Sequence, residues 1–303
     1  MVFDYTLLNG IFAPIVTPFD EHERICYEAI RDNIQHYNAT ALRGYMPLGS
    51  NGEFQGLSDE ESIRVLEVVC RYKSEEKVVV GGCGRESAYK TVEVIKKIVD
   101  YGLDLAFVLP PHYFVQQMTE EHLYRYYNKI ADESPIPIVI YNAPKFSGGL
   151  QVQPGLAAKL SRHENIVALK NSSPTRDGDY IEATEGEAFG VLAGNISKLY
   201  PGLVDGVIGG VISTASYLPE YCCELFQKFR DGEIKEAEKM HRFLSSLSAA
   251  GIGPMGVPGV KLGMTMRGLI GGHVRNPLID ANNEQWSAIK KLFEENGINS
   301  IEF

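Results

Sequence analysis

A candidate for chemistry in this sequence is a lysine that directly follows a short apolar run. Residues 166–169, IVAL, have the apolar and β-branched character of a buried strand, and Lys170 comes next, before the small polar run NSS. Most lysines at strand ends lie in water, which is one interpretation of Lys170. The sharper interpretation places its amine in a dry cavity, where loss of hydration lowers the pKa and frees the lone pair near neutral pH.

A neutral lysine amine can attack a ketone to form an imine. The protonated imine is an electron sink that stabilises a carbanion, or enamine, at the adjacent carbon. A tyrosine nearby can move protons to and from hydroxyl groups. Tyr141 ends the apolar run IPIVIY and is a candidate for this role, although it can also cap a core with its hydroxyl in water.

Two further segments carry polar groups at the ends of apolar runs. The loop GSNGE, Gly49–Glu53, offers glycine freedom, backbone N–H groups and the Ser50 hydroxyl, which suit a small carboxylate without a metal. By itself this pattern is that of an ordinary turn. The run PPHY ends at Tyr113. The histidines show no metal-ligand spacing, so we predict no metal and no cofactor beyond a covalent imine on Lys170.

The elements that must position these residues follow from eight short apolar runs, which alternate with amphipathic segments. Ser58 and Glu61, for example, form a capping-box signature ahead of a helical stripe. The runs are Ile11–Val16, Gly44–Leu48, Val78–Gly82, Leu105–Leu109, Ile136–Tyr141, Ile166–Leu169, Phe189–Ala193 and Val207–Ile212.

Eight buried strands that alternate with helices predict parallel pairing and, on closure, a (β/α)₈ TIM barrel. An open doubly wound sheet is the alternative, but no glycine fingerprint follows the first strand. Active sites of such barrels lie at the carboxyl ends of the strands, so Lys170, Tyr141, Ser50 and Tyr113 are expected to meet in one mouth.

After about residue 231 only helical patterns remain, around 233–250, 258–268 and 283–296. We therefore predict two parts, residues 1–232 as the barrel with the active site and residues 233–303 as a C-terminal helical region.

Composition excludes several other classes. The 303 residues include 29 basic and 39 acidic side chains, a net charge of −10, with no basic block for nucleic acid. Five cysteines without zinc spacing are typical of reduced thiols. No targeting segment or long apolar span is present, so we expect a cytoplasmic protein without membrane or nucleic-acid partners.

In combination the motifs resemble a known family. GSNGE, PPHY, YNAP, LKNSS, GGVIS and GGHVRNPL occur in the order found in the dihydrodipicolinate synthase and N-acetylneuraminate lyase superfamily of class I, Schiff-base aldolases. The resemblance covers nearly the whole chain, and the combination is far more specific than any one motif. It implies a TIM barrel that binds pyruvate or another 2-oxo acid without a metal.

Carried over by position, the resemblance implies that Lys170 forms the imine and Tyr141 is the general acid and base. Ser50 and Asn51, next to Gly49, match the pair that holds the pyruvate carboxylate. Tyr113 matches a relay tyrosine that reaches into the adjacent subunit, which implies a homo-oligomer, usually a dimer of dimers. The remaining matched positions line the pocket through their backbone and are Gly194 and Ile212.

One departure concerns the second substrate. Dihydrodipicolinate synthases have an arginine where this chain has Phe146, just after Lys145, so a bidentate carboxylate clamp is missing. The wording GSNGEF and GVPGVK is closer to 4-hydroxy-2-oxoglutarate and 2-keto-3-deoxy sugar acid aldolases. We therefore predict an aldolase that cleaves a 4-hydroxy-2-oxo acid to pyruvate and an aldehyde. The alternatives are a 4-hydroxy-tetrahydrodipicolinate synthase and a non-catalytic 2-oxo acid or sugar acid binding protein.

Overall fold

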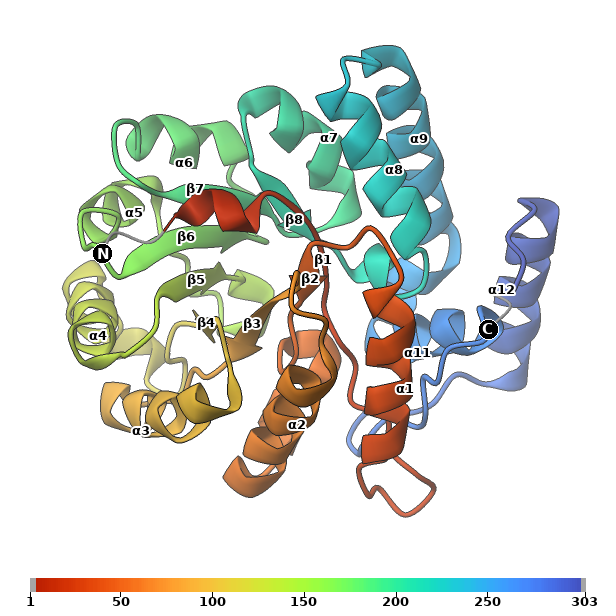
Figure 1. The fold of residues 1–303 in the computed structure, drawn as a ribbon, viewed down its shortest axis with the longest axis horizontal. Helices are drawn as coiled ribbons and strands as arrows, with labels where there is room; N and C mark the ends of the chain where they lie inside the picture. Colours follow the sequence, from red (N-terminus) through yellow and green to blue (C-terminus); the bar gives the residue numbers. More distant parts are fainter. Residues whose placement is uncertain (1–3, 301–303) are drawn as a thin grey trace.

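The computed structural model describes residues 4–300, in which eight parallel strands close into a barrel in chain order, β1 to β8 (Figure 1). The strands are β1 (Gly10–Ala13), β2 (Gly44–Tyr45), β3 (Val78–Gly82), β4 (Leu105–Val108), β5 (Ile138–Asn142), β6 (Ile166–Asn171), β7 (Gly190–Ala193) and β8 (Gly209–Val211). The predicted (β/α)₈ barrel is confirmed, and the open sheet is excluded because β8 pairs with β1.

Helices surround the strands, as Figure 1 shows. They are α1 (Tyr27–Asn38), α2 (Asp59–Tyr72), α3 (Ala88–Ile98), α4 (Glu120–Glu133), α5 (Pro154–Leu160), α6 (Asp177–Ala183), α7 (Ile196–Asp205) and α8 (Pro219–Arg230). The predicted capping box at the start of α2 is present, because Ser58 accepts from the Glu61 backbone while the Glu61 side chain accepts from Ser58 N–H.

Several strand boundaries differ from the prediction, and proline explains three of them. The first strand stops before Pro14, the second stops two residues before Pro47, and the fifth starts only after Pro137. Proline lacks the N–H group that a central ladder needs. The sixth strand is instead longer than predicted. It runs through Lys170 to Asn171, because Lys170 pairs with Tyr141 of β5 and with Leu192 of β7.

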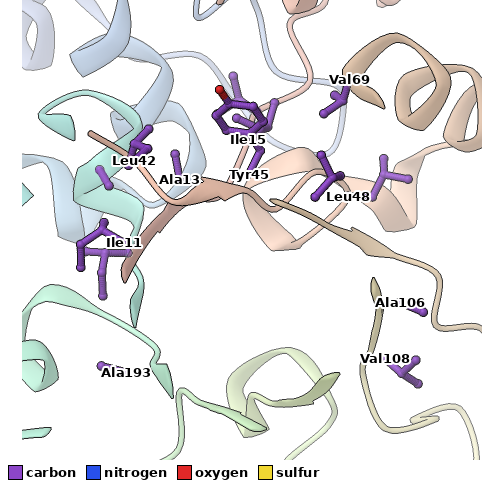
Figure 2. Packing of buried hydrophobic residues seen from close by; sticks show 14 of the residues in the cluster. Ile11, Ala13, Ile15, Leu42, Tyr45, Leu48, Val69, Ala106, Val108 and Ala193 are labelled. Carbon is purple, nitrogen blue, oxygen red and sulfur yellow. The ribbon is translucent and has the colours of Figure 1, made fainter. Parts of the chain in front are cut away.

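Side chains of the strands alternate between two buried layers. Figure 2 shows Ala13, Tyr45 and Val108 on the side of the strands that faces the helices. Phe12, between Ile11 and Ala13, belongs to the separate cluster that fills the barrel interior. Because successive strand residues point to opposite faces, this alternation also turns Tyr141 and Lys170 inward.

The chain after α8 is helical, and its elements are α9 (Ile234–Leu247), α10 (Gly253–Met255), α11 (Val257–Met266) and α12 (Asn283–Glu295). They lie to one side of the barrel in blue in Figure 1, with α9 packed on α7 and α8. A π-helical turn, Ser248–Ile252, joins α9 to α10, and α11 contacts the 3₁₀ turn Ser50–Gly52. The division of the chain at residue 232 stays a prediction.

Within residues 4–300, no single helix is both long and apolar enough to cross a membrane. One pair of helical segments, Ile234–Met255 and Val257–Met266, together has the length and composition of a membrane span, but the two segments are sharply bent relative to each other.

Candidate active site

Lys170 lies in the interior of the barrel mouth, because β6 carries it inward near the carboxyl end of the strand. The residue is 4% exposed, which excludes the interpretation that its amine sits in water. Its Nζ lies 4.5 Å from the centre of the Tyr141 ring and 5.6 Å from that of Phe107. Among residues 4–300, no carboxylate pairs with this amine. Burial therefore lowers the pKa of Lys170 to about 7, so a large share of the amine is neutral at physiological pH.

Tyr141 lies beside Lys170 on the neighbouring strand, and its ring stacks on Phe107 at 4.5 Å between ring centres. Its hydroxyl is 3.3 Å from Ser50 Oγ and also hydrogen-bonds to Ser172. Burial raises the pKa of Tyr141, and the hydrogen bonds to the two serines offset part of that shift. The hydroxyl is thus protonated at neutral pH and linked to Ser50, as a group that donates and recovers a proton must be.

The predicted carboxylate loop borders the same space. Ser50–Gly52 forms a 3₁₀ turn, and Asn51 Nδ2 donates to Ser213 Oγ at 3.1 Å. Gly194 also lines this space, where a Cβ would lie 2.2 Å from Ser172 Oγ and 2.4 Å from the Asn171 carbonyl. Only glycine fits there, because the backbone at the end of β6 approaches so closely.

These groups line a cavity of about 490 Å³ at the carboxyl ends of the strands. Lys170, Tyr141, Ser50, Asn51, Gly194 and Phe146 all border it, as do Ser172 and Ser213, which the sequence did not single out. Residues of the C-terminal region from Ser248 to Val260 form part of the wall. The only charged side chains in the lining are Lys145 and Lys170, so the described part of the site carries no acidic wall.

Phe146 stands where a second cavity meets the first. The second cavity has about 270 Å³ and shares Ser50, Phe146, Val257 and Leu278 with the first. Phe146 is 46% exposed. It therefore presents an apolar ring to the outer part of the site, where the resemblance would place a guanidinium.

Three predicted residues do not border the cavity. Gly49 and Ile212 directly precede the lining residues Ser50 and Ser213. Tyr113 is 78% exposed and does not line this chain's own cavity. The roles assigned to all three stay predictions.

The sequence reasoning missed an ion pair behind the carboxylate loop, between Glu53 and Lys261. Glu53 is the last residue of the motif GSNGE, and Lys261 is the last residue of GVPGVK. The apolar residues on either side of Lys261, Val260 and Leu262, could have indicated that this lysine is buried, and all three residues are buried in the structure. As for metals, residues 4–300 contain no group of three histidine, cysteine, aspartate or glutamate side chains placed to hold an ion.

Comparisons with known proteins agree with this geometry. The chain matches the model of the dihydrodipicolinate synthetase family over residues 7–296. A 4-hydroxy-tetrahydrodipicolinate synthase of Methanothrix thermoacetophila is 32% identical over 288 residues, which cover 94% of this chain and 96% of the relative. A synthase of the same name from Methanoculleus marisnigri is 29% identical over 295 residues, which cover 96% of this chain and 100% of the relative.

A solved structure extends the likeness to three dimensions. Dihydrodipicolinate synthase from Aquifex aeolicus has a TM-score of 0.88 to this chain at 26% identity, covering 97% of this chain and 100% of the other. The barrel and its buried lysine define a carbon–carbon lyase of the pyruvate-dependent, Schiff-base aldolase class. Within that class, the chain belongs to the dihydrodipicolinate synthetase family. The alternative of a non-catalytic binding protein is thereby set aside.

Proposed function

We propose that this protein uses Lys170 to form an imine with pyruvate and makes or breaks a carbon–carbon bond at C3 of that imine. The observation that carries the proposal is a buried amine with a pKa of about 7 beside the Tyr141 hydroxyl. An amine in this state is a nucleophile without prior removal of a proton by another group.

The steps follow from the positions of the groups. Lys170 Nζ attacks C2 of pyruvate and water leaves, which gives the iminium. Tyr141, having given its proton to the hydroxyl that leaves C2 as water, takes a proton from C3, and the resulting enamine attacks the aldehyde carbon through C3. Tyr141 donates its proton to the aldehyde oxygen as that bond forms, with Ser50 as its hydrogen-bond partner. Hydrolysis releases the 4-hydroxy-2-oxo acid and restores Lys170, and cleavage runs the same steps in reverse. The turn that bears Ser50 and Asn51 receives the carboxylate.

For the second substrate, the relatives support condensation of pyruvate with aspartate semialdehyde. The two curated relatives described above are named 4-hydroxy-tetrahydrodipicolinate synthase and match this chain over nearly its full length. Lys145, which lines the cavity, supplies a cation for the carboxylate of such an aldehyde.

A specific observation favours the second candidate, an aldolase that cleaves a different 4-hydroxy-2-oxo acid. Phe146 lines the outer cavity where a guanidinium would clamp a carboxylate, and Lys145 is a single point charge from another direction. A substrate held chiefly by its pyruvate half needs no such clamp.

The test begins with intact mass after incubation with pyruvate and borohydride. We expect one reduced pyruvyl adduct on the wild type and none on Lys170→Ala. An unmodified wild type would remove the proposed mechanism. Parallel assays then measure pyruvate consumption with aspartate semialdehyde and pyruvate release from 4-hydroxy-2-oxo acids. The larger kcat/KM selects between the two candidate reactions.

We further infer a cytoplasmic homo-oligomer. The five cysteines are all free thiols, as expected of a reducing compartment. The exposed side chains of Tyr113 and Phe114, edge to face at 5.0 Å, give an apolar projection for a second subunit to cover. Light scattering should give a dimer or larger, and a monomer that retains full activity would contradict the role of Tyr113.

A further inference from the structure

A buried ion pair lies behind the loop that carries Ser50 and Asn51, and the proposed chemistry does not use it. Lys261 Nζ is 2.6 Å from Glu53 Oε1, and the two side chains are 3% and 6% exposed. Glu53 follows Asn51 by two residues, whereas Lys261 belongs to α11, more than 200 residues later in the chain. The pair thus joins the carboxylate loop to the C-terminal region.

Lys261 holds the loop by a second route as well. Its Nζ donates to the carbonyl of Thr17 at 2.7 Å and to that of His273. The Thr17 hydroxyl in turn donates to the carbonyl of Gly52 at 2.7 Å. One ammonium group therefore fixes the loop through the side chain of Glu53 and through the backbone of Gly52.

Arg275 completes the attachment from the same region. Its backbone N–H donates to Glu53 Oε2 at 2.9 Å, and its guanidinium donates to the carbonyl of Gly56 at 2.8 Å. The guanidinium is itself oriented by Glu61, with two contacts of 2.9 Å. Each carboxylate oxygen of Glu53 thus has a partner in the C-terminal region.

The backbone at Glu53 needs such partners. Its φ of 53° lies in the left-handed region, which a residue with a side chain adopts only when its surroundings impose it. The turn formed by Ser50–Gly52 immediately precedes this residue. Glu53 therefore directly follows the turn that carries the two residues bordering the cavity.

We propose that Lys261 is a positioning residue for the 2-oxo acid, which acts through Glu53 to hold Ser50 and Asn51 where the substrate carboxylate binds. The inference rests on the proposed imine chemistry but holds for either aldehyde. Lys170 and Tyr141 stand on separate strands, so loss of the ion pair should weaken pyruvate binding and leave imine formation at saturation intact.

The experiment measures how the yield of borohydride-trapped adduct depends on pyruvate concentration, which requires no second substrate. For Lys261→Met we expect the half-saturating concentration to rise about tenfold, as small misplacements of binding groups do. The plateau at saturating pyruvate should stay near that of the wild type. Glu53→Gln keeps the shape of the side chain and is the milder variant in case Lys261→Met does not fold; we expect a several-fold rise.

The matched control is Lys77, another buried lysine. It is 6% exposed and donates to the carbonyls of Thr40 and Leu42 at 2.7 and 2.8 Å. It precedes β3, at the end of the barrel opposite the cavity. Lys77→Met loses two buried carbonyl contacts, as Lys261→Met does, but no ion pair, so it should lower the melting temperature without moving the half-saturating concentration of pyruvate.

The outcomes separate this inference from the proposed function. A wild type without adduct refutes the imine chemistry. A wild type that forms the adduct, together with Glu53→Gln and Lys261→Met within twofold of its half-saturation, overturns the inference alone. An equal rise in Lys77→Met also overturns it, because the effect would then be a general loss of stability.

Discussion

Two buried lysines of this molecule, Lys170 and Lys261, are equally inaccessible and equally close to an aromatic ring, but they differ in whether a carboxylate pairs with the amine. Both are nearly inaccessible, at 4% and 2% exposed, and the Nζ of each lies about 4.5 Å from an aromatic ring centre, that of Tyr141 and that of Phe19. Lys261, however, has one carboxylate and two carbonyl partners, whereas Lys170 has no acid paired with it among residues 4–300.

Burial alone therefore does not make a lysine reactive. Burial lowers the pKa of both residues, but for Lys261 the charge of Glu53 opposes that shift. A paired ammonium stays protonated and serves to hold structure. An unpaired one loses its proton near neutral pH and becomes a nucleophile.

The largest effect is expected from replacing Lys170. Lys170→Met should abolish both the pyruvyl adduct and turnover, a loss of more than about 10⁴-fold, as removal of a covalent nucleophile causes in other enzymes. Lys261→Met should still form the adduct at saturating pyruvate. Turnover in Lys170→Met near that of the wild type would show that the unpaired amine is not the nucleophile.

The second test removes the hydroxyl beside Lys170 and keeps the aromatic ring. Tyr141→Phe leaves an aromatic ring under the amine but removes the hydroxyl that hydrogen-bonds to Ser50. We expect kcat to fall about 10²–10⁴-fold, the range for loss of a general acid or base, while the trapped adduct still forms. Steady-state kinetics and intact mass on the same sample measure both. Full activity would assign the proton transfer to another group.

Stability should change in opposite directions when the two lysines are replaced. Removal of one partner from a buried pair leaves the other charge uncompensated, so Lys261→Met should lower the free energy of unfolding by about 3–5 kcal/mol. Lys170→Met should raise it at pH 6, on the order of a few kcal/mol, because it removes a buried unpaired amine.

The pH dependence of that gain follows from the pKa of Lys170. The value is about 7 in the folded chain against 10.5 for the ordinary group, so the unfolded chain binds the proton more tightly. The destabilisation is complete below pH 7 and is relieved as the pH rises from 7 toward 10.5. Urea unfolding of wild type and Lys170→Met at pH 6 and pH 9.5 should show the larger difference at pH 6. A difference independent of pH would contradict the lowered pKa.

The smallest expected effect concerns a cation added to the mouth. Phe146→Arg supplies a guanidinium that can clamp a carboxylate, so the ratio of kcat/KM for aspartate semialdehyde to that for an uncharged aldehyde should rise about tenfold. Ile279→Arg is the control, because Ile279 is 81% exposed and lines neither cavity. An equal change in both variants would reflect the added net charge instead.

Much of the barrel could be predicted from the sequence, because apolar runs of strand length must be buried and their alternation with helices leaves few topologies. Strand ends were less predictable where proline removed a ladder donor, as at Pro14, or where pairing with neighbours extended a strand, as at Lys170. The motifs predicted most of the named residues that border the cavity. Ser172 and Ser213 could be identified as lining residues only from the structure, because separate strand ends bring them together.

The two lysines mark the boundary between what each level of description decides. In the sequence both follow apolar residues, VALK for Lys170 and PGVK for Lys261, and these local contexts do not distinguish a nucleophile from a structural cation. The sequence placed Lys170 at the end of an apolar strand and Lys261 in an apolar helical segment, and it left open whether either amine is buried. The tertiary structure is what pairs Lys261 with Glu53 and leaves Lys170 without a paired acid among residues 4–300. The sequence could not show this, because the partners of a buried charge come from segments far away in the chain.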